Sequence, residues 1–264
     1  MAQSVEICGN FEQGELLVGT SENATKVKLN DNEFDVNDKG EFLIAVPRDE
    51  KQNSKLEVFY ASGKSEKFML NIKKHSWDIQ SIKGVAQNKV TPSKTDETEI
   101  LRESTDVKTA LLSGDDLAQD WKNGFILPLK GIISGHFGNQ RIFNDVPKNP
   151  HSGTDIAAPS GTKIAASGDG KVLLAGGNYF YSGNMVIIDH GQGLKTMYAH
   201  LDKALVNVGD IVKKGDVIGL VGATGRATGP HLHWGATVKN VRFRPHSLLE
   251  ENINKCVVLQ KGAN

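Results

Sequence analysis

Short runs in which apolar and polar residues alternate fill the first part of the chain. Between residues 14 and 75 apolar and polar side chains alternate within short runs, and turn formers such as Ser62-Gly63 separate the runs. Alternation with a period of two predicts half-buried strands, and short strands between turns are typical of a small antiparallel sandwich. We therefore predict an N-terminal β-sandwich-like module over residues 1–75 that acts as a spacer or docking domain. The predicted strands contain residues 27–29, 34–36, 56–60 and 68–72.

The pattern changes between residues 76 and 124, which we predict to be a helical connecting arm. Ser93 followed by Asp96 resembles the capping box of a helix start. Apolar residues then recur at helical intervals, at Ile100, Leu101, Val107 and Leu111. We predict one amphipathic helix that ends near Ser113-Gly114 and packs its apolar stripe on one of the domains it joins. The alternative is an arm that lies over an active cleft and regulates it.

Strand patterns return beyond Phe125, with glycine in almost every turn. The chain holds 28 glycines, many of them between short β-branched runs such as 185–188, MVII. Such spacing predicts a tightly turned antiparallel sheet. The predicted fold class is therefore mainly β: a C-terminal Gly-rich antiparallel β domain over residues 125–250, joined by the helical arm to the N-terminal β-sandwich module. Residues 251–264 are predicted to be a C-terminal tail.

One internal echo lies within this second domain. Residues 208–212, VGDIV, are repeated in kind at 214–218, KGDVI, and predict two short strands joined by a turn. The echo resembles the hairpins of biotinyl and lipoyl carrier domains. No lysine with Met neighbours accompanies it at a hairpin tip, so a prosthetic-group carrier is disfavoured.

Composition and charge exclude several classes of function. The chain of 264 residues is 38% hydrophobic and 23% charged, and its 31 basic residues balance 31 acidic ones. No global field therefore favours nucleic acid, and we expect no nucleic-acid partner. No apolar run approaches the roughly 20 residues of a membrane-spanning helix, and we expect no transmembrane segment in this chain. Met1-Ala2-Gln3 lacks the basic and apolar regions of a signal peptide.

The two cysteines, Cys8 and Cys256, lie at opposite ends of the chain. Whether they meet in space cannot be read from the sequence. We expect a free pair rather than a disulfide, and neither cysteine has the spacing of a metal knuckle.

Histidines after residue 130 carry the candidate chemistry. The segment 151–155, HSGTD, offers an imidazole and a carboxylate four residues apart, in a turn that runs into a strand. Both groups are suitable zinc ligands, and a third ligand is needed. His231 and His233 lie two residues apart in a predicted strand, so they share a face and can supply that ligand with one imidazole to spare.

His200 is a further candidate for a catalytic role. Strand alternation predicts that Thr196, Tyr198 and His200 share one face. A zinc site with three protein ligands and an open position activates water for hydrolysis, and a neighbouring imidazole can take the proton or stabilise an oxyanion. By contrast, we expect structural roles for His136, for His190 at a turn, and for His246 near a helix start.

These motifs together are specific. HxxxD at 151–155, Tyr198-Ala199-His200-Leu201 and the segment 229–234, GPHLHW, occur in that order inside a Gly-rich β domain. From residue 127 to residue 249, including 138–144 and 225–228, the chain resembles the lysostaphin and LytM type of zinc endopeptidase, peptidase family M23. The resemblance implies that His151, Asp155 and His233 hold Zn²⁺, while His200 and His231 flank the attacking water and the oxyanion. One departure is Arg242-Phe243-Arg244-Pro245, where relatives often have an acidic residue before the proline; it alters the groove wall.

The resemblance also implies a substrate and a location. It predicts a zinc-dependent endopeptidase that hydrolyses peptide cross-links of bacterial peptidoglycan, at D-alanyl to diaminopimelate bonds, in the periplasm or cell envelope. The expected partners are the peptide stems of peptidoglycan, and the protein is expected to be a monomer. The alternatives are a glycyl-glycine endopeptidase, a non-catalytic wall-binding protein or amidase activator, and an unrelated β-rich binding module with incidental histidines.

Overall fold

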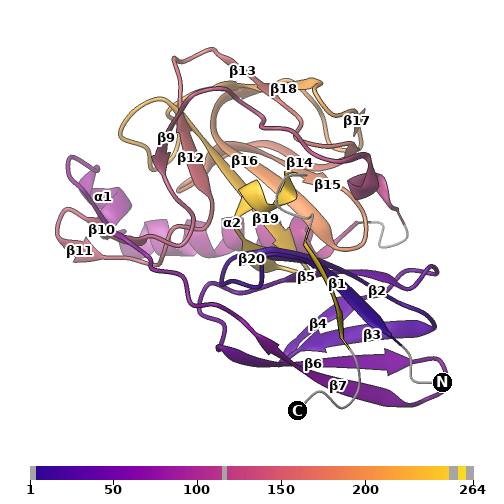
Figure 1. The fold of residues 1–264 in the computed structure, drawn as a ribbon. Helices are drawn as coiled ribbons and strands as arrows, with labels where there is room; N and C mark the ends of the chain where they lie inside the picture. The colour runs from indigo at the N-terminus through magenta and orange to yellow at the C-terminus, as the bar shows by residue number, and fades with distance from the viewer. Residues whose placement is uncertain (1–3, 115–117, 250–254, 260–264) are drawn as a thin grey trace.

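The computed structural model describes residues 4–114, 118–249 and 255–259. Strands dominate these residues and most pairings are antiparallel, so the predicted mainly β fold class is confirmed. In Figure 1 the N-terminal sandwich lies below a large sheet, and helix α2 (Lys94–Leu112) runs beside that sheet. No helix in the described part of the chain is long and apolar enough to cross a membrane.

The N-terminal sandwich is made of two four-stranded antiparallel sheets. Apolar residues at alternate positions of their strands, such as Val5, Ile7, Val27 and Leu29, are fully buried. The alternation therefore acts as predicted, with one face of each sheet in the core. One sheet has the order β21-β1-β2-β5 and contains β21 (Cys256–Leu259), β1 (Val5–Gly9), β2 (Leu16–Ser21) and β5 (Glu41–Ala45). The other has the order β4-β3-β6-β7 and contains β4 (Asn32–Asp35), β3 (Ala24–Leu29), β6 (Asn53–Tyr60) and β7 (Ser65–Asn71).

The end of the chain returns to this sandwich, in the segment predicted to be a tail. Strand β21 pairs with β1, and Cys256 lies opposite Cys8 in the ladder. The two cysteines form a disulfide. The expectation of a free pair is therefore wrong. The two cysteines are 248 residues apart in sequence, and the pairing of their strands brings the thiols together. No local sequence pattern predicts such a pairing.

The connecting arm contributes both a strand and helices. Strand β8 (Ile79–Ile82) pairs in parallel with β10 (Gln140–Phe143), which also pairs with β11 (Val146–Pro147). A one-turn helix, α1 (Gln87–Val90), follows, then the long helix α2, and a 3-10 turn (Asp120–Asn123) stands just before the large sheet. Strand β8 is too short and too polar on one side to be predicted from periodicity.

Helix α2 has the predicted ends. Ser93 accepts a hydrogen bond from the backbone N–H of Asp96, whose side chain accepts one from the Ser93 backbone N–H, so the capping box is complete. The predicted stripe is only partly right, because Leu101 is 69% exposed whereas Leu111 is buried. The buried face of the helix instead includes Glu103. Its carboxylate accepts a hydrogen bond from the Phe180 backbone N–H.

The C-terminal domain is built on one large sheet of ten strands. Its main order is β17-β14-β15-β16-β19-β12-β9, and all its pairings are antiparallel. The strands on this path are β17 (Ile211–Val212), β14 (Gly170–Tyr179), β15 (Gly183–Asp189), β16 (Leu194–Ala204), β19 (His231–Val238), β12 (Thr154–Ala157) and β9 (Ile132–Gly135). Off this path lie β13 (Lys163–Ala165), β18 (Val217–Val221) and β20 (Val241–Phe243), and a 3-10 turn (Pro245–Leu248) follows β20.

The predicted hairpin at residues 208–218 is wrong. Strand β17 pairs with β14, whereas β18 pairs with β13 and β16, so the two echoed segments do not pair with each other. Each finds a partner strand elsewhere because the turn between them leads across the sheet rather than back along it.

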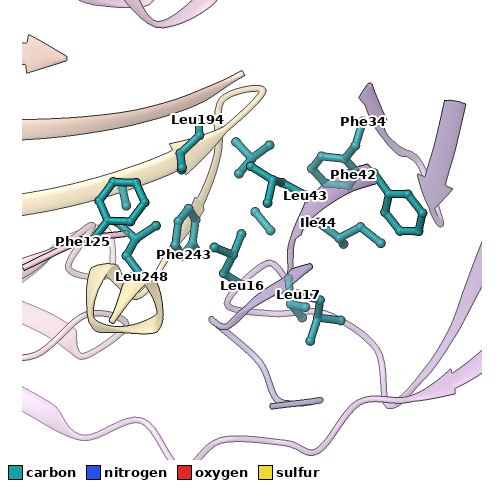
Figure 2. Close-up of a cluster of buried hydrophobic side chains, with 14 of the residues drawn as sticks. Leu16, Leu17, Phe34, Phe42, Leu43, Ile44, Phe125, Leu194, Phe243 and Leu248 are labelled. Carbon is teal, nitrogen blue, oxygen red and sulfur yellow. The ribbon is translucent and has the colours of Figure 1, made fainter. Parts of the chain in front are cut away.

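A continuous apolar core joins the sandwich to the large sheet. Figure 2 shows Leu16 and Leu43 of the sandwich beside Phe243 and Leu194 of the C-terminal domain. Polar contacts surround this core, including an ion pair between Glu15 and Arg244 at 2.7 Å. The N-terminal module is therefore packed directly on the C-terminal domain as well as connected to it by the arm.

Candidate metal centre

The strand β19 presents one face to the core and the other to a cluster of histidines. Leu232 and Trp234 are fully buried in the core, and His231 and His233 alternate with them on the opposite face. His233 lies directly opposite Asp155 of β12 in the antiparallel ladder. Residues that are paired in this way point to the same side of a sheet, so the ladder brings a carboxylate to the imidazoles.

His151 reaches the same point from the turn that leads into β12. Gly153 makes this possible, because a Cβ atom at that position would lie 2.8 Å from His233 Nε2 and 2.4 Å from the Trp234 carbonyl oxygen. The glycine in the HSGTD segment is thus required by the close approach of two strands. The structure brings His151, Asp155 and His233 together as predicted from the sequence.

Three ligand atoms of these residues form a small triangle. Asp155 Oδ1 lies 2.9 Å from His233 Nδ1 and 3.0 Å from His151 Nε2, and the two ring nitrogens are 2.9 Å apart. His151 Nδ1 lies 2.9 Å from the His136 carbonyl oxygen and donates to it, which leaves a lone pair on Nε2. Lone pairs that face a carboxylate at this distance are stabilised by a cation between them, and two imidazoles with one carboxylate are a common zinc donor set.

The second carboxylate oxygen of Asp155 is engaged by Arg141. The guanidinium Nη2 donates to Asp155 Oδ2 in a short ion pair, and both side chains are largely buried. Arg141 therefore holds the carboxylate with its other oxygen toward the histidines. Burial raises the pKa of the Asp155 carboxyl, but its close contacts with the imidazoles of His151 and His233 outweigh burial and hold that pKa well below its ordinary value.

His231 and His200 lie beside this triangle. His231 Nδ1 donates to the Gly229 carbonyl oxygen at 2.8 Å and His200 Nδ1 to the Thr224 carbonyl oxygen at 2.8 Å. Their rings are 4.7 Å apart between centroids, and His231 Nε2 is 3.8 Å from Asp155 Oδ1. These bonds leave Nε2 as the unprotonated nitrogen of each neutral ring.

The predicted facing of His200 is wrong. Tyr198 points into the core, where its hydroxyl bonds to Ser167, whereas the His200 ring faces His231 and His233 on the other side. The ladder between β15 and β16 shifts register here, and His200 has a φ of 63°, in the left-handed region. This bulge breaks the period of two, so side-chain alternation could not place His200.

Burial favours the neutral form of the imidazoles of His151, His233 and His200. It lowers the pKa of His151, that of His233 to about 4 and that of His200 to about 3. For His200, the neighbouring His231 and His233 lower it further. A neutral ring can bind a metal or accept a proton, and a protonated one cannot.

The two histidines of the triangle line a cleft of about 660 Å³, which we call the main cleft. His151, His200 and His233 line it, together with Arg141 and Arg226. A side pocket of about 290 Å³ adjoins it and is lined by Asp155 and His231, with the same two arginines. The triangle is thus reached from two adjoining cavities.

The connecting arm contacts the surroundings of the triangle at two places. Ile82 and Val85 of the arm line the side pocket. Met197 and Ala199 share the sheet face of His233, since Ala199 lies opposite His233 in the ladder, and both pack against Leu111 in α2. Helix α2 therefore covers the sheet face next to the metal triangle, and control of the cleft by the arm stays a prediction.

The remaining C-terminal histidines lie outside the triangle. His190 is fully buried, with Nδ1 2.6 Å from the Asp169 carbonyl oxygen and Nε2 2.7 Å from Thr196 Oγ1, so both nitrogens are used within the fold. His246 lies in the 3-10 turn and its ring contacts Trp234. The His136 side chain is exposed, and only its carbonyl reaches the site.

Two arginines of the site lie in segments that carry the family resemblance, but the sequence analysis gave them no role. Arg141 holds Asp155, and Arg226 stands between the main cleft and the side pocket. An available signal for Arg141 is Gly135, where a Cβ atom would lie 2.7 Å from Asp155 Oδ2 and 2.8 Å from Arg141 Nη2. A glycine at that point makes room for the ion pair, but one sequence does not show why it is there.

Comparisons with known proteins agree with this geometry. The sequence profile of peptidase family M23 matches residues 149–245, which include the triangle and both neighbouring histidines. A crystal structure of a Pseudomonas aeruginosa protein assigned to peptidase M23 superposes with a TM-score of 0.70 at 30% identity, covering 92% of this chain and 96% of that one. That match extends over the sandwich and the arm as well as the large sheet.

Two curated relatives come from Vibrio cholerae serotype O1. The peptidoglycan DD-endopeptidase ShyB is 50% identical over 91 residues, which are 34% of this chain and 21% of the relative. The peptidoglycan DD-endopeptidase ShyA is 43% identical over 143 residues, 53% of this chain and 32% of the relative. The matched part thus spans only about a fifth to a third of these relatives. The profile match over the histidine cluster and the structural match over nearly the whole length show that this chain belongs to peptidase family M23.

Proposed function

We propose that this protein is a zinc-dependent endopeptidase that hydrolyses peptide cross-links of bacterial peptidoglycan. The observation that carries the proposal is the triangle of His151, Asp155 and His233 beside an open cleft, with two further imidazoles aimed at it. Three protein ligands with an open side are the usual arrangement of a catalytic zinc site, whereas a fourth protein ligand would close it.

Zn²⁺ suits the donors at this site. Two neutral imidazole nitrogens and one carboxylate oxygen lie within 4.8 Å of one another. A bound zinc ion would supply a Lewis acid that polarises the scissile carbonyl and makes water a stronger nucleophile at neutral pH. The His136 carbonyl and Arg141 fix His151 and Asp155, so the ligand atoms are held in place before any ion binds.

His231 and His200 have the geometry for proton transfer and oxyanion stabilisation. The Nδ1 atom of each ring is tied to a backbone carbonyl, so its orientation is fixed and its Nε2 atom faces the centre. The neutral form of His200 is favoured by burial. We assign the Nε2 lone pair of one ring to take the proton of the attacking water, and the imidazolium N–H formed in this way to stabilise the tetrahedral oxyanion, with the other ring fixed beside it.

The proposed substrate is the D-alanyl to diaminopimelate cross-link. The relatives ShyA and ShyB are named peptidoglycan DD-endopeptidases, and the model of peptidase family M23 matches the residues of the histidine cluster. The main cleft and the side pocket share Arg141 and Arg226, so we expect a peptide that crosses the centre to pass from one cavity into the other.

We further propose a periplasmic or cell-envelope location. The disulfide between Cys8 and Cys256 supports it, because disulfides persist in oxidising compartments and are rare in reducing ones. Cross-linked peptidoglycan is also found in the envelope, so the substrate and the disulfide point to the same place.

Metal removal and digestion of sacculi test this function. The purified protein is expected to bind about one equivalent of zinc, to release defined peptide-linked fragments from sacculi, to lose this activity on chelation and to regain it with zinc. Mass spectrometry of the fragments identifies the bond. His75→Gln serves as a control, because His75 contacts Glu12 away from the cleft and its loss is expected to leave activity unchanged.

Two results would refute the proposal. One is a zinc-loaded protein that cuts no cross-linked muropeptide, which would favour a wall-binding or activator role. The other is release of glycine fragments from glycine-bridged walls without cleavage at D-alanyl to diaminopimelate bonds, which would reassign the substrate.

A further inference from the structure

Arg226 is held between two aromatic rings at the junction of the main cleft and the side pocket. Its guanidinium carbon lies 4.3 Å from the ring centroid of Tyr181 and 4.7 Å from that of Phe143. The backbone N–H of Arg226 donates to the Tyr181 carbonyl oxygen at 2.8 Å. The planar cation is thus stacked and oriented, with its edge left for a ligand.

Ion pairing with carboxylates distinguishes Arg226 and Arg242 from the other arginines among the described residues. Four of the six arginines of the chain form an ion pair with a carboxylate: Arg48 with Asp49, Arg102 with Asp106, Arg141 with Asp155 and Arg244 with Glu15. The other two, Arg226 and Arg242, have no ion pair with any residue that the structure describes, and both line the main cleft. Burial, and then the nearby charge of Arg141, lowers the pKa of Arg226, as expected for a cation without a counter-ion.

The main cleft as a whole is positively charged. Arg141, Lys148, Arg226 and Arg242 line it, and no described residue in its wall is acidic. The carboxylate of the triangle, Asp155, is already paired with Arg141. In a chain with 31 basic and 31 acidic residues this is a local concentration of charge, and a cleft lined by one sign of charge attracts the opposite sign.

We propose that Arg226 binds a free carboxylate of the substrate on the residue next to the scissile bond. Arg226 lines both cavities that meet at the metal triangle, so a peptide that crosses the centre passes it. A guanidinium pairs with a carboxylate through two parallel hydrogen bonds, which gives both affinity and orientation.

This inference rests on the proposed function and sharpens its substrate class. In a D-alanyl to diaminopimelate cross-link, the scissile nitrogen is attached to a carbon that carries a free carboxylate. A glycine bridge has no side-chain or branch carboxylate at that place. Arg226 therefore makes the protein selective for carboxylate-bearing cross-links over neutral ones, a distinction that the ligand spacing alone does not give.

A matched pair of substrates tests the role of Arg226. The substrates are a cross-linked muropeptide dimer with the free diaminopimelate carboxylate at the scissile residue and the same dimer with that carboxylate amidated. We compare kcat/KM for the zinc-loaded wild type, Arg226→Gln and Arg226→Lys. Arg102→Gln is the control, since Arg102 lies on the exposed side of α2. Affinity for both dimers is measured by calorimetry in a zinc-loaded His231→Ala background, in which turnover is blocked.

The wild type is expected to prefer the free carboxylate by about tenfold or more, the effect of one charge-assisted hydrogen-bonded pair. Arg226→Gln should lose this preference by slowing cleavage of the free form alone, Arg226→Lys should keep part of it, and Arg102→Gln should match the wild type. Equal loss on both dimers, no preference in the wild type, or binding of neither dimer would overturn the inference. Arg226-dependent preference in binding without any cleavage would refute the endopeptidase function and leave the carboxylate site standing.

Discussion

Two groups of buried histidines in the large domain differ in how their ring nitrogens are used. His190 is fully buried and has a pKa lowered by burial to about 4, much like His233. Both nitrogens of His190 are bonded within the fold, to the Asp169 carbonyl and to Thr196. In the candidate metal centre, His151, His200 and His231 each bond Nδ1 to a backbone carbonyl, and the Nε2 atom of His151 lies within the triangle, 3.0 Å from Asp155 Oδ1.

The contrast shows that burial and a shifted pKa do not mark a functional site by themselves. A structural histidine satisfies both nitrogens, whereas a site histidine satisfies one and keeps the other for a group that the protein does not supply. The backbone carbonyl on Nδ1 also fixes which nitrogen carries the proton. Substitutions at these positions are expected to separate the structural histidine from the site histidines.

The largest effects are expected at the pair His231 and His233. His233→Ala removes a ligand, so bound zinc should fall below about half an equivalent and activity should be lost with it. His231→Ala leaves the triangle intact, so zinc should stay near one equivalent while turnover falls by about 10²- to 10⁴-fold. Metal analysis and turnover rates measured on the same preparations check both. Loss of zinc in His231→Ala with retention in His233→Ala would mean that the two roles are reversed.

His190 should influence stability rather than activity. Its pKa is about 4 in the folded protein against 6.5 ordinarily, so the unfolded state binds more protons between these values. The contribution of a neutral His190 is therefore present above pH 6.5 and lost as the pH falls to about 4, by roughly 3 kcal/mol. Denaturant unfolding of the zinc-free protein at several pH values should show a smaller acid loss in His190→Gln than in the wild type. Equal slopes would contradict the assignment.

Replacement of Arg141 should have a smaller effect, confined to the affinity for the metal. Arg141→Gln frees Asp155 Oδ2, and loss of a group that orients a ligand typically weakens metal binding by about 10- to 100-fold. Competition with a chelator measures this affinity, with Arg102→Gln as the control. An unchanged zinc affinity would show that Asp155 does not need Arg141 to hold its orientation.

Local sequence patterns predicted much of this fold and most of the site. Alternation located β3, β4, β6 and β7, and the Ser93 capping box located the start of α2. The spacing of His231 and His233 placed both rings on one face of a strand. These features depend on neighbours in sequence, through the side-chain periods of strands and helices.

The features that were missed depend on contacts between distant segments or on broken periodicity. Strand β21 and the disulfide need β1, from the other end of the chain, and β8 needs β10. His200 was placed on the wrong face because a bulge with a positive φ reverses the alternation. Arg141 reaches Asp155 only across the turn after β10, and no local pattern indicates that ion pair.

The most direct test is the position of zinc in crystals of the protein, found by anomalous scattering at the zinc edge. We predict one strong peak about 2.0 to 2.2 Å from His151 Nε2, Asp155 Oδ1 and His233 Nδ1, with no fourth protein ligand. His200 and His231 should lie beside it without direct contact. A peak on other residues, or none at the triangle in zinc-soaked crystals, would contradict the proposed metal centre and the function built on it.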